Sequence, residues 1–260
     1  MRTLKGLARL CYRLVSPLSN FLRLPWLPRY YAAYLIDAYR YSRQPHAEKI
    51  SLLDLFPCIY DNTGSNPFDS HYFYQDIWAF KEVIKSAPAW HVDVGSTAIF
   101  VGMVSAVVDV TFVDIRPLRV DLDRYSYKAG SILEMPFAND SVESLSCLHV
   151  AEHIGLGRYG DPLDAEGTQK AARELARVLA PGGRLLFSVP IGRPRIEFNA
   201  HRIHSATQIL DYFGSLKLVD FSGVDDRGIF KKRRDIGELD NCEYGCGFFI
   251  FSKPQLKVSL

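Results

Sequence analysis

Two histidines and a glutamate lie close together in the segment His149-Val150-Ala151-Glu152-His153. The pKa of histidine is close to neutral pH, so an imidazole can take a proton from a hydroxyl group while a neighbouring carboxylate orients the ring. We therefore expect a general base here, and the catalytic candidates are His149, Glu152, His153 and, further along the chain, His201. The alternative is that Glu152 and His153 hold a loop in place by hydrogen bonds, and both interpretations stay open.

A second group of residues has the types and spacing of a nucleotide-binding site. Gly95 follows a short apolar run, and glycine allows a close approach between backbone and ligand. Asp114 ends the next apolar run about 20 residues later, the usual distance to a carboxylate that accepts hydrogen bonds from ribose hydroxyls. Gly95 and Asp114 together predict a cofactor that contains a ribose.

A regular framework must position these residues, and the apolar pattern after residue 90 predicts one. Strands are expected at 90–94, 111–115, 144–150 and 185–189. The stretches between them are long enough for parallel crossover connections. Two late strands, at 216–221 and 247–251, are expected to pair antiparallel at the edge of the sheet.

Three helices are predicted around these strands. The clearest spans 165–180, where Ala172, Leu175 and Ala176 share one face and a Pro-Gly-Gly sequence follows. The other two are expected at 72–86 and 205–213. The fold class is therefore α/β of the Rossmann type, a mostly parallel sheet with an antiparallel edge strand and helices on both faces, and ligands are expected at the carboxyl ends of the strands.

The chain is expected to have two parts, a basic and aromatic N-terminal helical arm at 1–50 and the Rossmann domain at 51–260. Basic residues far outnumber the single acid, Asp37, at the start of the chain: Arg2, Lys5, Arg9, Arg13, Arg23, Arg29, Arg40 and Arg43. One interpretation is an arm that packs on the catalytic domain or on a second subunit of a homo-oligomer. The other is peripheral contact of residues 1–45 with the inner face of a membrane.

Composition limits the partners and the compartment. The 31 basic and 29 acidic residues leave a net charge of +2, which does not favour a nucleic-acid partner. Five cysteines, an odd number, fit a reducing compartment, so we expect a cytoplasmic protein. Cys242 and Cys246 lack a second ligand pair at zinc-site spacing, and Glu152, His153 and Asp161 have no established metal-ligand spacing, so no metal is expected. No apolar run reaches the roughly 20 residues of a membrane span.

Several motifs resemble those of a known family. Residues 130–137 with 140–145, the segment 149–154, and residues 173–186 resemble, in the correct order, the core of the class I S-adenosylmethionine-dependent methyltransferases. The stretches 67–76, 155–162 and 197–202 are similar, more closely, to a methyltransferase-like family catalogued as a domain of unknown function. That resemblance spans about residues 55 to 252.

The resemblance implies an S-adenosylmethionine cofactor, with the Asp93 carboxylate facing its cationic amino group and the Asp114 carboxylate facing its ribose. The cofactor-binding candidates are Asp93, Gly95, Ser96, Asp114, Ile115, Ser131, Ile132 and His149. Polar groups that suit a polyhydroxylated acceptor follow later strands, and the substrate-binding candidates are Tyr159, Asp161, Asn199 and Arg202.

Two functions are consistent with this resemblance. The first is methylation of an oxygen of a sugar or related small molecule in surface-polysaccharide synthesis. The second is a non-catalytic or repurposed Rossmann protein that binds a nucleotide sugar or serves as a scaffold in a glycan-assembly complex. The turn after Gly95 has fewer glycines than is usual in the superfamily, and Ser131 stands where an acid often accepts from the adenine amino group. Both departures favour the second function.

Overall fold

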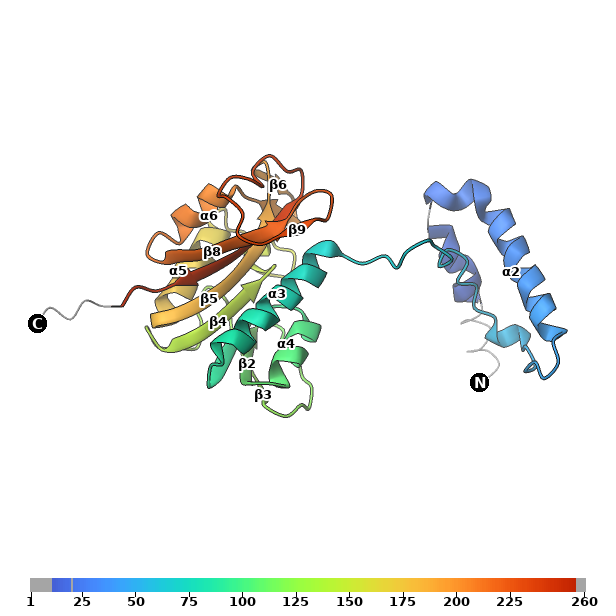
Figure 1. The fold of residues 1–260 in the computed structure, drawn as a ribbon, viewed down its shortest axis with the longest axis horizontal. Helices are drawn as coiled ribbons and strands as arrows, with labels where there is room; N and C mark the ends of the chain where they lie inside the picture. Colours follow the sequence, from blue (N-terminus) through green and yellow to red (C-terminus); the bar gives the residue numbers. More distant parts are fainter. Residues whose placement is uncertain (1–10, 20, 256–260) are drawn as a thin grey trace, which may run out of the picture. The chain divides into compact units, whose positions relative to one another are not determined.

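The computed structural model describes residues 11–19 and 21–255 (Figure 1). The chain divides into two compact units, Met1–Pro67 and Phe68–Leu260, and each is described by itself. In the described part of the chain, no helix has both the length and the apolar character needed to cross a bilayer.

The described part of the first unit is largely helical. It contains η1 (Ser16–Ser19), η2 (Phe21–Trp26), α2 (Leu27–Ser42) and η3 (Leu52–Asp54). A proline stands in the first turn of α2, where a backbone N–H would have no acceptor within the helix, so its absence costs no hydrogen bond. The Tyr30 ring meets the edge of the Tyr60 ring at 5.2 Å, and the Tyr60 hydroxyl donates to the Pro17 carbonyl at 3.1 Å. The helical arm expected at 1–50 begins with residues 1–10, which lie outside the described residues, and the compact unit extends to Pro67.

The second unit is built on an eight-stranded sheet with the order β3-β2-β1-β4-β5-β10-β8-β9. Its strands are β1 (Trp90–Val94), β2 (Asp109–Asp114), β3 (Tyr125–Ala129), β4 (Val142–Leu148), β5 (Leu179–Ile191), β8 (Lys217–Val224), β9 (Phe230–Lys231) and β10 (Gly245–Ser252). Neighbours from β3 to β5 pair in parallel, whereas β10 runs antiparallel to both β5 and β8, and β9 is antiparallel to β8. The predicted Rossmann-like fold, a mostly parallel sheet with an antiparallel edge, is confirmed.

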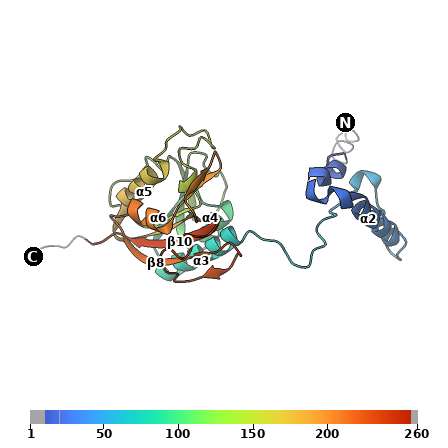
Figure 2. The same ribbon diagram turned by 90° about the horizontal axis from the view of Figure 1, so that it is seen from above.

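Helices cover both faces of this sheet (Figure 2). The helices are α3 (Ser70–Ser86), α4 (Ala98–Ser105), α5 (Gly167–Val178) and α6 (Ala206–Tyr212). The chain leaves β1 toward β2 in one direction and passes from β4 to β5 in the other, so right-handed crossovers place α4 and α5 on opposite faces. Two apolar clusters result, one with the side chains of α3 and α4 and the other with those of α5 and α6.

Local sequence explains most of these elements. Asp69 caps α3 by accepting from the backbone N–H groups of His71 and Tyr72, and a Ser205–Gln208 capping box starts α6. The helix expected at 165–180 ends earlier, at Val178, because Leu179 already pairs with Val142 in the sheet. The apolar pattern did not predict β3, because this edge strand is mostly exposed and polar. A short ribbon of β6 (Arg195–Glu197) and β7 (His201–Ile203) and the turn η4 (Ala151–His153) complete the unit.

Candidate functional site

A cavity of about 440 Å³ opens at the carboxyl ends of β1, β2 and β4. The strand order reverses between β1 and β4, and the diverging connections leave a crevice at such a point in an open α/β sheet. The volume falls within the range of small-molecule sites. The cavity is lined by Val94, Gly95, Val113, Asp114, Ile115, Arg116, Gly130, Ser131, Ile132, Leu133, His149, Val150, His153, Ile154, Tyr159, Gly160, Asp161, Pro162, Leu163 and Asp164.

Gly95 and Asp114 form one wall of this cavity. Gly95 has φ +65°, in the left-handed region that favours glycine. A Cβ at this position would lie 3.2 Å from Val150 Cγ1 and 3.3 Å from Asp114 Oδ2. Asp114 Oδ1 accepts from the Arg116 backbone N–H at 2.6 Å, and this bond orients the carboxylate. The wall therefore needs a glycine, and it presents an acidic group beside bare backbone.

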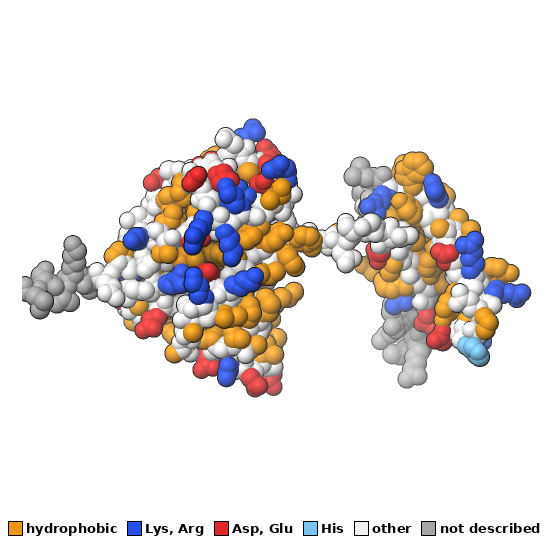
Figure 3. Space-filling model, viewed as in Figure 1, with side chains coloured by type: hydrophobic (Ala, Val, Ile, Leu, Met, Phe, Trp, Pro, Cys, Tyr) orange, Lys and Arg blue, Asp and Glu red, His pale blue; other side chains and the backbone are white. Residues whose placement is uncertain are grey.

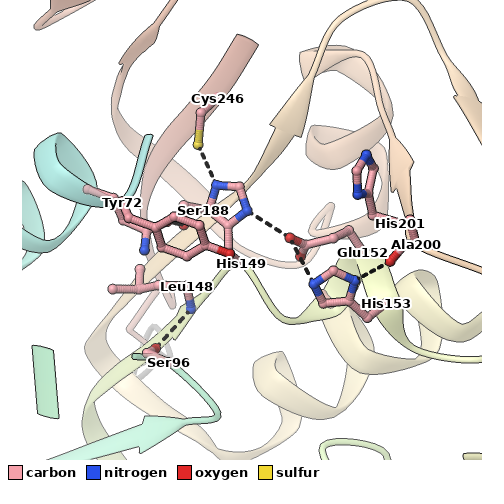
Figure 4. Close-up of polar contacts among 12 residues, drawn as sticks. Tyr72, Ser96, Leu148, His149, Glu152, His153, Ser188, Ala200, His201 and Cys246 are labelled. Atoms are coloured by element: carbon pink, nitrogen blue, oxygen red, sulfur yellow. Dashed lines mark hydrogen bonds and ion pairs between the residues drawn. The ribbon is translucent and has the colours of Figure 1, made fainter. Parts of the chain in front are cut away.

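The non-glycine residues of the turn do not fill the cavity. Ser96 Oγ donates to Asp93 at 2.7 Å and accepts from the Leu148 backbone N–H at 3.2 Å, so it faces the interior (Figure 4). Thr97 caps α4 and donates to Asp76 at 2.8 Å. The side chains of Ser96 and Thr97 therefore leave the cavity open, because both hydroxyls have partners inside the protein.

Asp93 is fully buried beneath this turn and does not line the cavity. Its carboxylate accepts from the backbone N–H and the hydroxyl of Ser96 and from the hydroxyl of Ser146. Burial raises the pKa of Asp93 to about 7, although these three donors act in the opposite direction. Asp93 and Ser96, both expected at the cofactor, are thus placed where they support the turn.

Part of the lining is mainly apolar. It consists of Ile115, Ile132 and Leu133, together with Ser131. The Ser131 hydroxyl accepts from the Leu133 backbone N–H at 3.1 Å, and it retains its own proton for a further bond. This arrangement suits a flat aromatic ring edged by one polar group.

The catalytic candidates at the end of β4 form a connected group (Figure 4). Glu152 Oε1 lies 2.8 Å from His149 Nδ1 and 3.7 Å from His153 Nε2. His153 Nδ1 lies 2.6 Å from the Ala200 carbonyl. His149 and His153 line the cavity, whereas Glu152 is fully buried behind them. The arrangement fits two imidazoles oriented by one carboxylate.

His149 and Glu152 are charged partners. Burial by itself lowers the pKa of His149, but the Cys246 sulfur and the Glu152 carboxylate outweigh burial and raise it well above its usual value. Burial likewise opposes the charged form of Glu152, yet His149 and His153 hold its pKa below the usual value. Glu152 Oε2 has no hydrogen-bond partner in the described structure.

The residues expected at the acceptor divide into two groups. Tyr159 and Asp161 line the cavity, whereas Asn199, Arg202 and the base candidate His201 do not. Arg202 is buried, and its guanidinium donates to the carbonyls of Ile154 and Asp164. Arg202 therefore holds together the two ends of the loop that carries Tyr159. Asp161 also serves this loop, since Oδ2 accepts from the Gly155 backbone N–H at 2.6 Å.

Arg116 and Leu163 are among the lining residues that were not predicted. The Arg116 guanidinium stacks over the Tyr159 ring at 4.2 Å and brings a cation to the cavity. The sequence could have indicated Arg116 as a site residue, because it stands only two residues after the predicted ribose-binding Asp114. Leu163 follows the substrate candidate Asp161 and lines the cavity from the same loop. His201 lies 3.2 Å from Glu197 Oε2 and packs against the Tyr244 ring, away from the cavity.

A family model described as "Caenorhabditis protein of unknown function, DUF268" matches residues 94–231. No curated protein matches the chain in sequence.

Several solved structures are similar to the chain. A candidate sarcosine dimethylglycine methyltransferase from Galdieria sulphuraria is 15% identical, with a TM-score of 0.50 over 70% of this chain and 86% of that one. The N-methyltransferase NodS of Bradyrhizobium japonicum in complex with S-adenosyl-L-homocysteine is 15% identical, with a TM-score of 0.49 over 76% and 92% of the two chains. The likeness to the Galdieria protein shows that the chain has this methyltransferase's fold.

Proposed function

The chain belongs to the DUF268 family, and we propose that it is an S-adenosylmethionine-dependent methyltransferase acting on an oxygen of a sugar or related small molecule in surface-polysaccharide synthesis. One observation carries the proposal. The Asp114 carboxylate lies in the cavity wall beside Gly95, where an added Cβ would meet it at 3.3 Å. A carboxylate next to bare backbone at the switch point of the sheet suits a ribose.

The other lining residues fit the rest of that cofactor. Ile115, Ile132 and Leu133 offer an apolar slot for adenine, and the Ser131 hydroxyl lies at its edge. His149 lines the wall at the end of β4. S-Adenosylmethionine supplies an electrophilic methyl group when bound. The protein then has to exclude water, hold the acceptor hydroxyl in line and remove its proton.

We assign the removal of the acceptor hydroxyl's proton to His153. Its ring lines the cavity, Nδ1 is engaged by the Ala200 carbonyl, and Nε2 lies toward the Glu152 carboxylate. A ring whose Nδ1–H is held in this way keeps Nε2 as the proton acceptor. Tyr159 meets the His153 ring edge to face at 5.6 Å and offers an aromatic surface for a sugar ring.

Calorimetry with S-adenosylmethionine tests the proposal directly. The wild-type chain is expected to bind it saturably, and Asp114→Asn is expected to weaken binding roughly 10- to 100-fold through loss of a charged hydrogen-bond acceptor. Asp109→Asn is the matched control, because Asp109 is exposed at the other end of the same strand. His153→Asn should retain binding and lose transfer of a labelled methyl group to sugar acceptors. No heat at millimolar cofactor contradicts the proposal.

Binding of a nucleotide sugar without catalysis is the second candidate function. The observation that favours it is the Arg116 guanidinium at the cavity, a group that suits a diphosphate. Thermal unfolding with S-adenosylmethionine, S-adenosylhomocysteine and nucleotide sugars separates the two candidates, since a ligand bound only by the native state raises the midpoint. A shift with nucleotide sugars alone favours the second function, including a scaffold role in glycan assembly.

For the N-terminal unit we propose peripheral contact with an anionic membrane surface on the cytoplasmic side. Helix α2 has no buried residue, and it exposes Leu35, Ile36 and Tyr39 together with Arg29 and Arg40 (Figure 3). Such a mixture suits the headgroup boundary. The full chain should float with phosphatidylserine vesicles, and Leu35→Glu should weaken flotation. Concentration-dependent dimers without flotation assign α2 to a contact between subunits instead.

A further inference from the structure

Three side chains from distant parts of the chain meet beside the cavity. His71 lies in the first turn of α3, His149 follows β4, and Cys246 lies in β10. One ligand atom from each lies within 4.8 Å of the other two, and all three residues are buried. His149 Nε2 is 3.0 Å from Cys246 Sγ (Figure 4), and the His71 ring stacks on the His149 ring. The fold thus gathers two imidazoles and one thiol around a single point.

This donor set matches a particular class of metal ion. Tetrahedral Zn²⁺ binds histidine nitrogen at about 2.0–2.1 Å and cysteine sulfur at about 2.3 Å, which places neighbouring ligand atoms roughly 3.3–3.7 Å apart. His149 Nε2 and Cys246 Sγ are 3.0 Å apart and no pair of ligand atoms is more than 4.8 Å apart, so shifts of about 1 Å would reach such spacing. Imidazole and thiolate select borderline or soft ions, whereas Mg²⁺ and Ca²⁺ require oxygen ligands. Zn²⁺ is one ion that this donor set fits, and copper, which also binds to two histidines and a cysteine, is another.

The surroundings of His149 support the same interpretation. A metal-binding histidine usually directs its second ring nitrogen to a carboxylate, which fixes the tautomer and the ring orientation. Glu152 Oε1 lies 2.8 Å from His149 Nδ1, while Nε2 points to Cys246. His149 also has φ +55°, an uncommon conformation for a residue other than glycine. The ring is therefore held with its free nitrogen toward the other two ligands.

An alternative chemistry for these groups is a cysteine nucleophile. His149 contacts both Cys246 and Glu152, so the three side chains are connected in the order of a catalytic thiol, a base and an orienting carboxylate. A nucleophile must reach a substrate atom, however, and Cys246 has no exposed surface and does not line the cavity. A metal ion requires no such access for a substrate. The burial of the thiol therefore favours a bound ion.

We propose that His71, His149 and Cys246 bind one Zn²⁺ ion and that Glu152 positions His149 for this role. The ion takes the place of the protons on Cys246 Sγ and His149 Nε2, so binding by the protonated cluster releases two protons to solvent. It links α3, the end of β4 and β10, and it fixes one wall of the cavity. The sequence predicted no metal, because the three ligands have no recognisable spacing along the chain.

The test uses the untagged full chain, stripped with a chelator and then titrated with Zn²⁺ or Co²⁺ alone. Elemental analysis should find one equivalent of zinc, and the cobalt form should show a thiolate charge-transfer band. Both His71→Gln and Cys246→Ser should abolish the cobalt band and stoichiometric zinc binding. Cys147→Ser is the matched control, because Cys147 is equally buried in β4 but lies outside the cluster. Glu152→Gln should lower zinc affinity about 10- to 100-fold.

The readout is metal binding and does not depend on methyl transfer or on S-adenosylmethionine. Failure of the wild type to bind one equivalent overturns the proposal, as does equal binding by Cys147→Ser and Cys246→Ser. Circular dichroism shows whether Cys246→Ser folds. If it does not fold, the test is whether the cobalt band is present in the wild type and absent in His71→Gln. A rise in the thermal midpoint with zinc should appear in the wild type and be absent in His71→Gln.

Discussion

Gly95 and Gly102 offer the same substitution in two opposite settings. Gly95 has φ +65°, and a Cβ there would meet Val150 Cγ1 at 3.2 Å and Asp114 Oδ2 at 3.3 Å. The left-handed conformation costs an alanine about 1–2 kcal/mol, and the two neighbours must also move. Gly102 lies within α4, where an added methyl group would meet only open space, so alanine there should stabilise the helix by about 0.5–1 kcal/mol.

Urea unfolding of Gly95→Ala and Gly102→Ala measures this difference. The two free energies of unfolding should differ by about 1.5–3 kcal/mol, with the wild type between them. Calorimetry should also show weaker S-adenosylmethionine binding by Gly95→Ala alone, because the added methyl group displaces the Asp114 carboxylate. Wild-type stability and affinity for Gly95→Ala would refute the reasoning, since they would mean that the turn relaxes without cost.

Three further predictions concern the support of the site. Burial lowers the pKa of His91 to about 3, so between pH 6.5 and pH 3 this histidine is protonated in the unfolded chain but neutral in the folded protein. Lowering the pH in this range therefore destabilises the folded wild type. The destabilisation caused by His91→Gln should therefore shrink as pH falls from 6.5 to 4, by at most about 1.4 kcal/mol per pH unit, in urea titrations. Ser146 bonds to both His91 and Asp93, and Asp93 titrates in the wild type and in the variant alike, so its contribution largely cancels when the two are compared. A difference in stability between wild type and His91→Gln that stays constant with pH would contradict the prediction. Arg202→Met should leave two loop carbonyls unpaired, cost about 1–3 kcal/mol and speed proteolysis of the loop, which an unchanged cleavage pattern would exclude. Ser205→Ala removes the cap of α6 and should cost about 1 kcal/mol in thermal unfolding, whereas Ser205→Asp should retain most of the stability.

Much of the cavity followed from local sequence. Gly95, Asp114, Ile115, Ser131, Ile132, His149 and His153 were all predicted as site residues, and all of them line the cavity. They end or directly follow strands of the parallel sheet or lie in the loops at its carboxyl edge, and parallel strands bring these ends together. Chain order and strand position were sufficient to collect them.

Residues whose role depends on side-chain direction were harder to place. Asp93, in β1, and Ser96, in the turn after it, lie close to Gly95 in the chain, yet their polar atoms bond to each other, and Asp93 also bonds to Ser146. Arg202 has the chemistry of a substrate ligand, but packing turns it toward two loop carbonyls. Spacing along the chain does not fix these directions, because a buried polar group takes whichever partners the surrounding elements supply.

The sequence by itself determined the Rossmann-like framework, the first turn at Gly95 and the acid at Asp114, because periodicity, turn residues and strand ends are local properties. Only the tertiary structure decided which side chains face the cavity and which support it. It also brought His71, His149 and Cys246 within 4.8 Å of one another. Contacts between α3, the end of β4 and β10 arise from the packing of elements far apart in the chain, and no local pattern encodes them.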